Sequence, residues 1–131
     1  MLAIAGGKGG CGKTTTTWRL GRALAAAGRT PLLVDADVDM PDLHQTCDVP
    51  REPGLPEVGD GGDPASVAHA PSRHPRLSVL PAAGGDADDL LAAASRLRAW
   101  EGPVVLDCPA GALRDAVAPL RVASHTLLVT T

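Results

Sequence analysis

The 131-residue sequence contains no phenylalanine, tyrosine or asparagine, and its single isoleucine is Ile4. A hydrophobic core must therefore be built from leucine, valine and alanine, and hydrophobic residues as a class still make up 44% of the chain. That content, together with only 21% charged residues, excludes an intrinsically disordered chain. The length suits one globular domain.

Cysteines and long apolar runs are also scarce. Cys11, Cys47 and Cys108 form no C-x-x-C pair, so nothing indicates a disulfide framework. No apolar run approaches the roughly 18 residues of a transmembrane helix, and residues 1–5 are too few for a signal peptide. We therefore expect a cytoplasmic protein with no transmembrane segment and no amphipathic membrane helix.

Basic charge is limited, and lysine is rarer than arginine. The net charge of −3 argues against a basic surface for nucleic acid, so direct nucleic-acid binding is not supported. Lys8 and Lys13 are the two lysines of the chain, against ten arginines. Both lie in one glycine-rich stretch, which indicates that lysine is required there.

That stretch fits the phosphate-loop pattern G-x-x-x-x-G-K-[ST] between an apolar run and a helical segment. Glycines bring backbone N–H groups close to phosphate oxygens, and a helix N-terminus adds unpaired donors and positive potential. Lys13 is expected to reach the β- and γ-phosphates and Thr14 to bind Mg²⁺. A chance glycine-rich turn is disfavoured because strand, loop and helix agree. The predicted nucleotide-binding residues are Gly7, Gly9, Gly10, Cys11, Gly12, Lys13, Thr14 and Thr15.

Alternating apolar runs and helical patterns predict a three-layer α/β domain with a mostly parallel, five-stranded sheet flanked by helices. The strands are expected at 1–5, 31–34, 77–80, 103–106 and 126–131. Helices are expected at 12–27 with Gly28 as C-cap, at 65–69, from the Asp86 cap to 100, and at 112–122 with a bend near Pro119. The Pro- and Gly-rich segment 47–75 is predicted to be a functional or mobile loop, and His44, His69 and His74 to be surface residues.

An aspartate follows two of the predicted strands. Asp107 ends the fourth apolar run, which is the arrangement of a Walker B carboxylate that holds Mg²⁺ through water. The alternative is an aspartate that caps the next helix. Asp35 closes the second run, and Asp39 and Asp42, a little further on, are interpreted as solvated residues.

Lys8 extends the loop to K-G-G-x-G-K-T-T, which resembles the deviant Walker A motif of the ParA/MinD family of P-loop ATPases. The D-x-D segment at Asp35 and Asp37 resembles the switch I segment of that family, and D-x-P-x-G from Asp107 to Gly111 resembles its switch II segment. The resemblance implies a P-loop NTPase fold and hydrolysis of Mg-ATP to ADP and phosphate.

The resemblance also implies roles for individual residues. Lys8, Lys13 and Asp37 would be the catalytic residues, with Lys8 crossing an ATP-dependent homodimer interface and Asp37 orienting water or approaching the Mg²⁺ shell. Thr14 and Asp107 would hold the metal. Cys11 and Cys108 flank this region, and we interpret them as packing residues rather than iron–sulfur ligands. Trp18 has two interpretations, packing on its own domain or contact in a dimer.

Residues 1–131 match the N-terminal part of such a domain, so we expect a fold truncated at its C-terminal side. Three functions remain open. The first is an ATPase that positions or partitions a cellular cargo. The second is an ATPase for metal-cofactor assembly, and the third is a nucleotide-binding module without turnover.

Overall fold

The computed structural model describes residues 1–6, 12–109 and 114–129. Within them, five strands form one sheet in the order β3-β2-β4-β1-β5, and every neighbouring pair is parallel. The strands are β1 (Leu2–Ala5), β2 (Leu32–Asp35), β3 (Ser78–Leu80), β4 (Val104–Asp107) and β5 (His125–Leu128). The helices are α1 (Lys13–Ala26), α2 (Leu43–Cys47), α3 (Leu55–Gly59), α4 (Pro64–Val67), α5 (Ala87–Arg98) and α6 (Arg114–Val122). The predicted α/β fold is confirmed, with a sheet that is wholly parallel.

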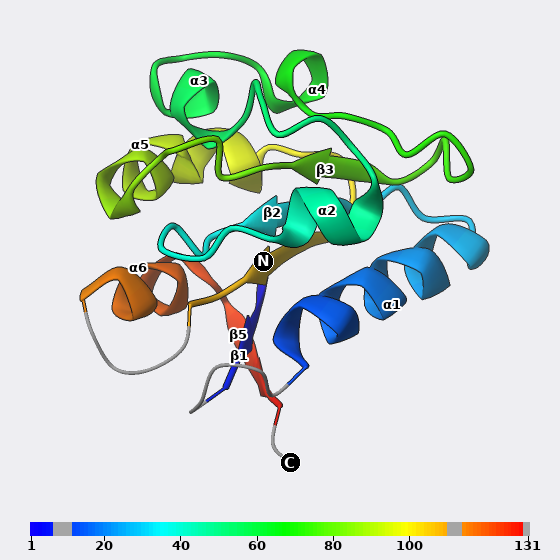
Figure 1. The fold of residues 1–131 in the computed structure, drawn as a ribbon, viewed down its shortest axis with the longest axis horizontal. Helices are drawn as coiled ribbons and strands as arrows, with labels where there is room; N and C mark the ends of the chain where they lie inside the picture. The colour runs from blue at the N-terminus through cyan, green and yellow to red at the C-terminus, as the bar shows by residue number, and fades with distance from the viewer. Residues whose placement is uncertain (7–11, 110–113, 130–131) are drawn as a thin grey trace.

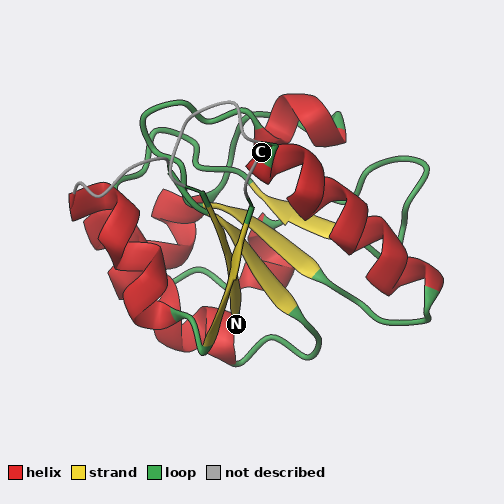
Figure 2. Ribbon diagram, turned by 90° about the horizontal axis from the view of Figure 1, so that it is seen from below, coloured by secondary structure: helices red, strands yellow, loops and turns green. Residues whose placement is uncertain are grey.

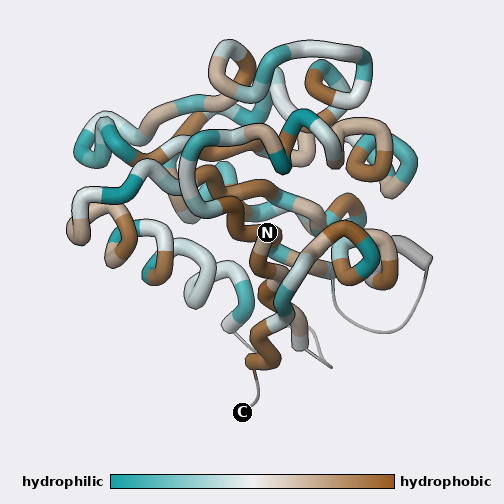
Figure 3. The backbone as a smooth tube through the Cα atoms, turned by 180° about the vertical axis from the view of Figure 1, so that it is seen from behind, coloured by the Kyte–Doolittle hydropathy of each residue, from teal (hydrophilic) through white to brown (hydrophobic). Residues whose placement is uncertain are grey.

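Helices cover both faces of the twisted sheet, as Figures 1 and 2 show. On one face α1 and α2 pack against Ile4, Leu33 and Val105. On the other face α3, α5 and α6 pack against a second set that includes Val34 and Leu106. Because both faces are covered, every residue of β2 and β4 is buried, which explains their unbroken apolar runs. Figure 3 shows these hydrophobic segments along the middle of the molecule.

The two long helices end as their sequences predict. After α1, Gly28 adopts φ +86°, its N–H donates to the Ala25 carbonyl, and the Arg29 N–H donates to the Leu24 carbonyl. This is a Schellman motif, which requires a left-handed residue and therefore favours glycine. At the start of α5, Asp86 and Asp89 form a reciprocal capping box with two bonds of 2.9 Å.

The segment 47–75 is more ordered than the sequence predicts, and the loop prediction is wrong in part. It contains α3 and α4, and α3 is anchored by Leu55 and Val58, which are both fully buried in the cluster that includes α5. Two apolar residues three positions apart are enough to anchor one helical turn in the core. They are too few to predict that turn from hydrophobic periodicity. The predicted helix 65–69 is observed as α4, one residue earlier and shorter.

The three histidines predicted at the surface are half-buried, and two of them have structural contacts. His69 Nε2 lies 2.8 Å from the Pro53 carbonyl oxygen, and its backbone forms an antiparallel bridge to Val79 at the sheet edge. His74 packs edge-on against Trp18 with ring centroids 5.2 Å apart. The prediction of surface residues is therefore confirmed in part: the three side chains remain partly exposed, but short helices and the sheet edge cover the rest of them.

The last strand is shorter than predicted and lies at an edge of the described sheet. β5 ends at Leu128, Val129 follows as irregular structure, and all four strand residues are exposed. Residues 112–113 and 130–131 of the predicted elements lie outside the described residues. Within the described residues, none of the helices has the length and apolar character that crossing a bilayer requires.

Candidate functional site

Two buried aspartates lie side by side at the carboxyl edge of the sheet. Asp35 is the last residue of β2 and Asp107 the last of β4, and the two are paired in register across the parallel ladder. Asp107 is also paired with Ile4 of β1, the strand that precedes the glycine-rich stretch. Carboxyl ends of parallel strands are where open α/β sheets bind ligands.

The start of α1 presents a helix N-terminus at this same edge. Gly12 caps the helix with φ +89°, a conformation that glycine adopts without steric cost, and the Thr16 N–H donates to its carbonyl at 2.8 Å. The first turn carries no acidic side chain, so the helix dipole is not offset by a negative residue. Lys13, the first helical residue, is buried with 7% of its surface exposed. Positive potential from the helix and the lysine suits an anion.

The Thr14 hydroxyl connects this helix to the acidic edge of the sheet. It lies 2.7 Å from Asp107 Oδ2 and 3.0 Å from Asp42 Oδ1. The other Asp107 oxygen, Oδ1, is buried and has no hydrogen-bond partner among the described residues. A buried carboxylate oxygen without a partner is energetically costly unless a cation or water satisfies it. The residues therefore fit a cation that would sit next to Thr14.

Burial and mutual repulsion raise the pKa values of these carboxyl groups. Loss of solvent is the main cause of the raised pKa of Asp35, about 8, and the neighbouring Asp107 charge adds to it. Desolvation also raises the pKa of Asp107 to about 7, although the Thr14 hydrogen bond opposes the change. The pKa of Asp37 is raised by burial as well, with Lys13 acting in the opposite direction. The ligand-free site therefore favours protonated carboxyl groups, and a bound cation would favour their charged forms in place of the protons.

The segment after β2 is held by its own aspartates. The two oxygens of Asp35 accept the N–H groups of Asp37 at 3.0 Å and Leu43 at 3.2 Å. Asp37 Oδ1 accepts the Met40 N–H at 3.2 Å. The carboxylates of this segment are therefore positioned by backbone bonds next to the start of α1.

The donor set fits Mg²⁺ better than a thiolate-bound metal. Burial raises the pKa values of Cys47 and Cys108 to about 12, so both thiols stay protonated and act as packing residues, as predicted for Cys108. Among the described residues, no three His, Cys, Asp or Glu side chains form a metal cage. Mg²⁺ normally uses one or two carboxylates together with phosphates and water, and a hydroxyl and a carboxylate such as Thr14 and Asp107 fit that pattern.

The structure brings most of the described predicted residues together. Lys13, Thr14, Asp37 and Asp107 lie at one edge of the sheet, linked by hydrogen bonds or charge interactions. Asp39 is exposed, in keeping with a solvated residue. The predicted residues Gly7, Lys8, Gly9, Gly10 and Cys11 lie outside the described residues, and so does Gly111.

The contacts of Asp42 and Trp18 bear on the interpretations of these two side chains. The interpretation of Asp42 as a solvated residue is confirmed in part: the residue is exposed, but its carboxylate also accepts a hydrogen bond from the Thr14 hydroxyl at 3.0 Å. The sequence feature that points to this contact is the position of Asp42 directly before Leu43. Burial of this leucine holds the acidic segment against the sheet. Trp18 packs against His74, and Arg22 stacks over its ring at 5.2 Å, which favours packing within the domain.

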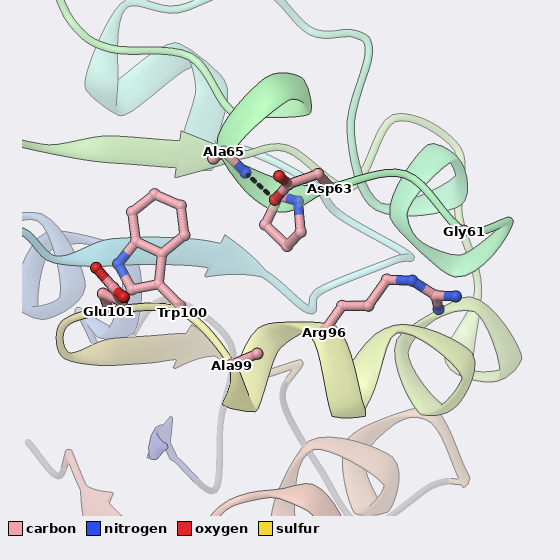
Figure 4. A pocket seen from close by; sticks show the side chains of 8 residues that line it. Gly61, Asp63, Ala65, Arg96, Ala99, Trp100 and Glu101 are labelled. Carbon is pink, nitrogen blue, oxygen red and sulfur yellow. Dashed lines mark hydrogen bonds between the residues drawn. The ribbon is translucent and has the colours of Figure 1, made fainter.

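A separate hollow of about 530 Å³ lies away from the carboxyl ends of the strands (Figure 4). Its walls include Asp63 before α4, and Arg96 and Trp100 at the end of α5. The Trp100 indole donates to the Thr30 carbonyl at 2.9 Å, which places this end of the hollow before β2 rather than after it. Side chains of both charges line it: Arg96 is positive, and Asp63 and Glu101 are negative. The carboxyl edge remains the candidate site.

We expect the stability of the ligand-free protein to fall as pH rises from about 4 to about 8. The folded-state pKa values of Asp35 and Asp107 are raised from 3.8 to about 8 and about 7, so the folded protein binds more protons than the unfolded chain in this window. The slope is up to about 1.4 kcal/mol per pH unit for each titrating group. Thermal unfolding across this range should show a falling Tm, with a shallower fall for Asp35→Asn. A Tm that rises with pH, or an unchanged slope in Asp35→Asn, would contradict this electrostatic description.

Comparison with known sequences places these features in a family. The sequence profile of the CobQ/CobB/MinD/ParA nucleotide binding domain matches residues 2–109. The septum site-determining protein MinD of Synechocystis is 33% identical over 143 aligned residues, which cover 100% of this chain and 53% of that protein. The chromosome partitioning protein ParA of Caulobacter vibrioides is 42% identical over 93 residues, covering 67% of this chain and 33% of ParA.

Solved structures agree with the sequence comparison. MinD of Pyrococcus horikoshii, complexed with Mg-ADP, superposes with a TM-score of 0.85 at 27% identity, over 98% of this chain and 56% of that one. Cobyrinic acid a,c-diamide synthase of Mycobacterium smegmatis, with bound ADP and magnesium, gives a TM-score of 0.80 at 25% identity, over 98% and 58%. The chain spans about half the length of the MinD proteins that it matches. By sequence and by fold, the chain belongs to the MinD/ParA family of nucleotide-binding domains.

Proposed function

We propose that residues 1–131 form a nucleotide-binding domain that binds ATP and ADP with Mg²⁺ and hydrolyses ATP to ADP and phosphate. The observation that supports it best is the Thr14 hydroxyl 2.7 Å from the buried Asp107 carboxylate, next to a helix N-terminus and a buried lysine. The Mg-ADP in the similar MinD structure supports the same ligand here.

Each residue at the edge has a defined part in this proposal. Gly12 and the start of α1 present backbone N–H groups to the phosphates, and Lys13 neutralises their charge. Thr14 and Asp107 would hold Mg²⁺, which when bound would supply positive charge beside the phosphates. Asp37 accepts a hydrogen bond from the attacking water and orients it.

The second part of the proposal concerns the cellular role of the ATPase. We infer that the ATP-bound chain forms a homodimer and positions or partitions a cellular cargo, as the names of its MinD and ParA relatives suggest. Release of phosphate from ATP would distinguish this ATPase from a nucleotide-binding module without turnover.

Replacement of Lys13 tests the nucleotide site. Lys13→Ala should weaken Mg-ADP binding about 10- to 100-fold in calorimetry, because it removes a charge-assisted contact worth roughly 1.5–3 kcal/mol. Arg19→Ala removes the same charge from an exposed position on α1 and should leave the affinity within about twofold. Circular dichroism of both variants controls for folding. Equal affinities of a folded Lys13→Ala variant and the wild type would refute the assignment.

Replacement of Lys8 tests the dimer. A lysine that contacts phosphate only across a two-fold interface makes ATP favour the dimer, and each subunit then completes the site of its partner. Sedimentation should show dimers with a non-hydrolysable ATP analogue and monomers with ADP. Lys8→Ala should stay monomeric with either nucleotide. If Lys8→Ala dimerises with the analogue as the wild type does, Lys8 is not an interface residue.

A further inference from the structure

Asp42 contacts the candidate metal site although the sequence pattern gives it no role there. It lies between β2 and α2, and its Oδ1 atom is 3.0 Å from the hydroxyl of Thr14, a residue 28 positions earlier in the chain. The same hydroxyl lies 2.7 Å from Asp107 Oδ2. Two carboxylates from different elements therefore meet at one threonine oxygen.

One hydroxyl cannot satisfy both carboxylates. Thr14 has a single O–H proton, so it can donate one full hydrogen bond or share one weaker bond between Asp42 and Asp107. Within the part of the chain that the structure describes, Asp107 Oδ1 has no hydrogen-bond partner, and the residue is 1% exposed. Two carboxyl groups thus converge on one oxygen, and a cation at that point would interact with both.

The backbone holds Asp42 in place at Thr14. The next residue, Leu43, is fully buried and donates its N–H to Asp35 Oδ2 at 3.2 Å. On the other side, the Met40 N–H donates to Asp37 Oδ1. The Asp42 side chain gives no cap bond to α2, so its carboxylate is not used to stabilise that helix. Its described hydrogen bond is the one to Thr14.

We propose that Asp42 supplies a second carboxylate to the shell of a divalent cation bound by Thr14 and Asp107. Carboxylate and hydroxyl oxygens are hard ligands, which suit Mg²⁺ and Mn²⁺. The inference rests on the proposed binding of Mg²⁺ with nucleotide and adds the residue that links this ion to the segment 37–43. Occupation of the metal site then fixes that segment against α1, since the segment contributes one of the ligands.

The test separates metal binding from nucleotide binding. Mg²⁺ is titrated calorimetrically into the ADP complex, and ADP is titrated separately in EDTA. Asp42→Asn keeps the size of the side chain and one acceptor oxygen but removes the charge. It should raise the Mg²⁺ dissociation constant about tenfold, the lower end of the loss found for residues that support metal ligands. The affinity for ADP in EDTA should be unchanged or higher, because a negative group near the phosphates is removed.

Asp39→Asn is the matched control, since Asp39 is an exposed aspartate of the same segment. It removes the same charge and should leave the Mg²⁺ dissociation constant within about twofold. Equal effects of Asp42→Asn and Asp39→Asn would overturn the role of Asp42 and leave nucleotide binding intact. A loss of ADP affinity in EDTA with Asp42→Asn would also overturn it, since that is the result of a structural role. A wild type that binds ADP without any response to Mg²⁺ would overturn the proposed function itself and the role of Asp42 with it.

Discussion

The burial of Asp107 beside Asp35 is the constraint on which the rest of the site depends. Because helices cover both faces of β2 and β4, the last residue of each strand lies in a desolvated position, and here those two residues are carboxyl groups in register. Burial of one charge is costly, and burial of two adjacent like charges costs more. The protein reduces this cost with the Thr14 hydroxyl and two backbone N–H groups, while Asp107 Oδ1 finds no partner in residues 1–6, 12–109 and 114–129. A cation bound beside Thr14 would satisfy this oxygen and offset the charge of the carboxylates.

The surrounding elements follow from the same constraint. The helix α1 starts where β1 ends, so its N-terminus brings Lys13 and positive potential to the acidic edge. The segment after β2 is folded around Asp35 and delivers Asp37 and Asp42 to the same place. A polyphosphate with its metal ion carries both signs of charge. It therefore complements a site in which donors and carboxylates lie side by side.

The sequence predicts the strands, the long helices and the site residues because each has a local signal. Unbroken apolar runs identify β2 and β4, and the cap residues Gly28 and Asp86 identify helix ends. Short elements lack such signals, so α3 is missed: its stability comes from burial of two side chains against α5 rather than from its own periodicity. Asp42 is missed for a similar reason, since a hydrogen bond across 28 residues depends on the tertiary fold.

The central claim is that Asp107 serves a metal ion at the nucleotide site. The most direct measurement is the affinity for ADP with and without Mg²⁺, for the wild type and for Asp107→Ala. This account predicts that Mg²⁺ strengthens ADP binding by the wild type and has no effect on the variant. An equal effect of Mg²⁺ on both proteins would contradict it, because the buried carboxylate would then have no part in holding the ion.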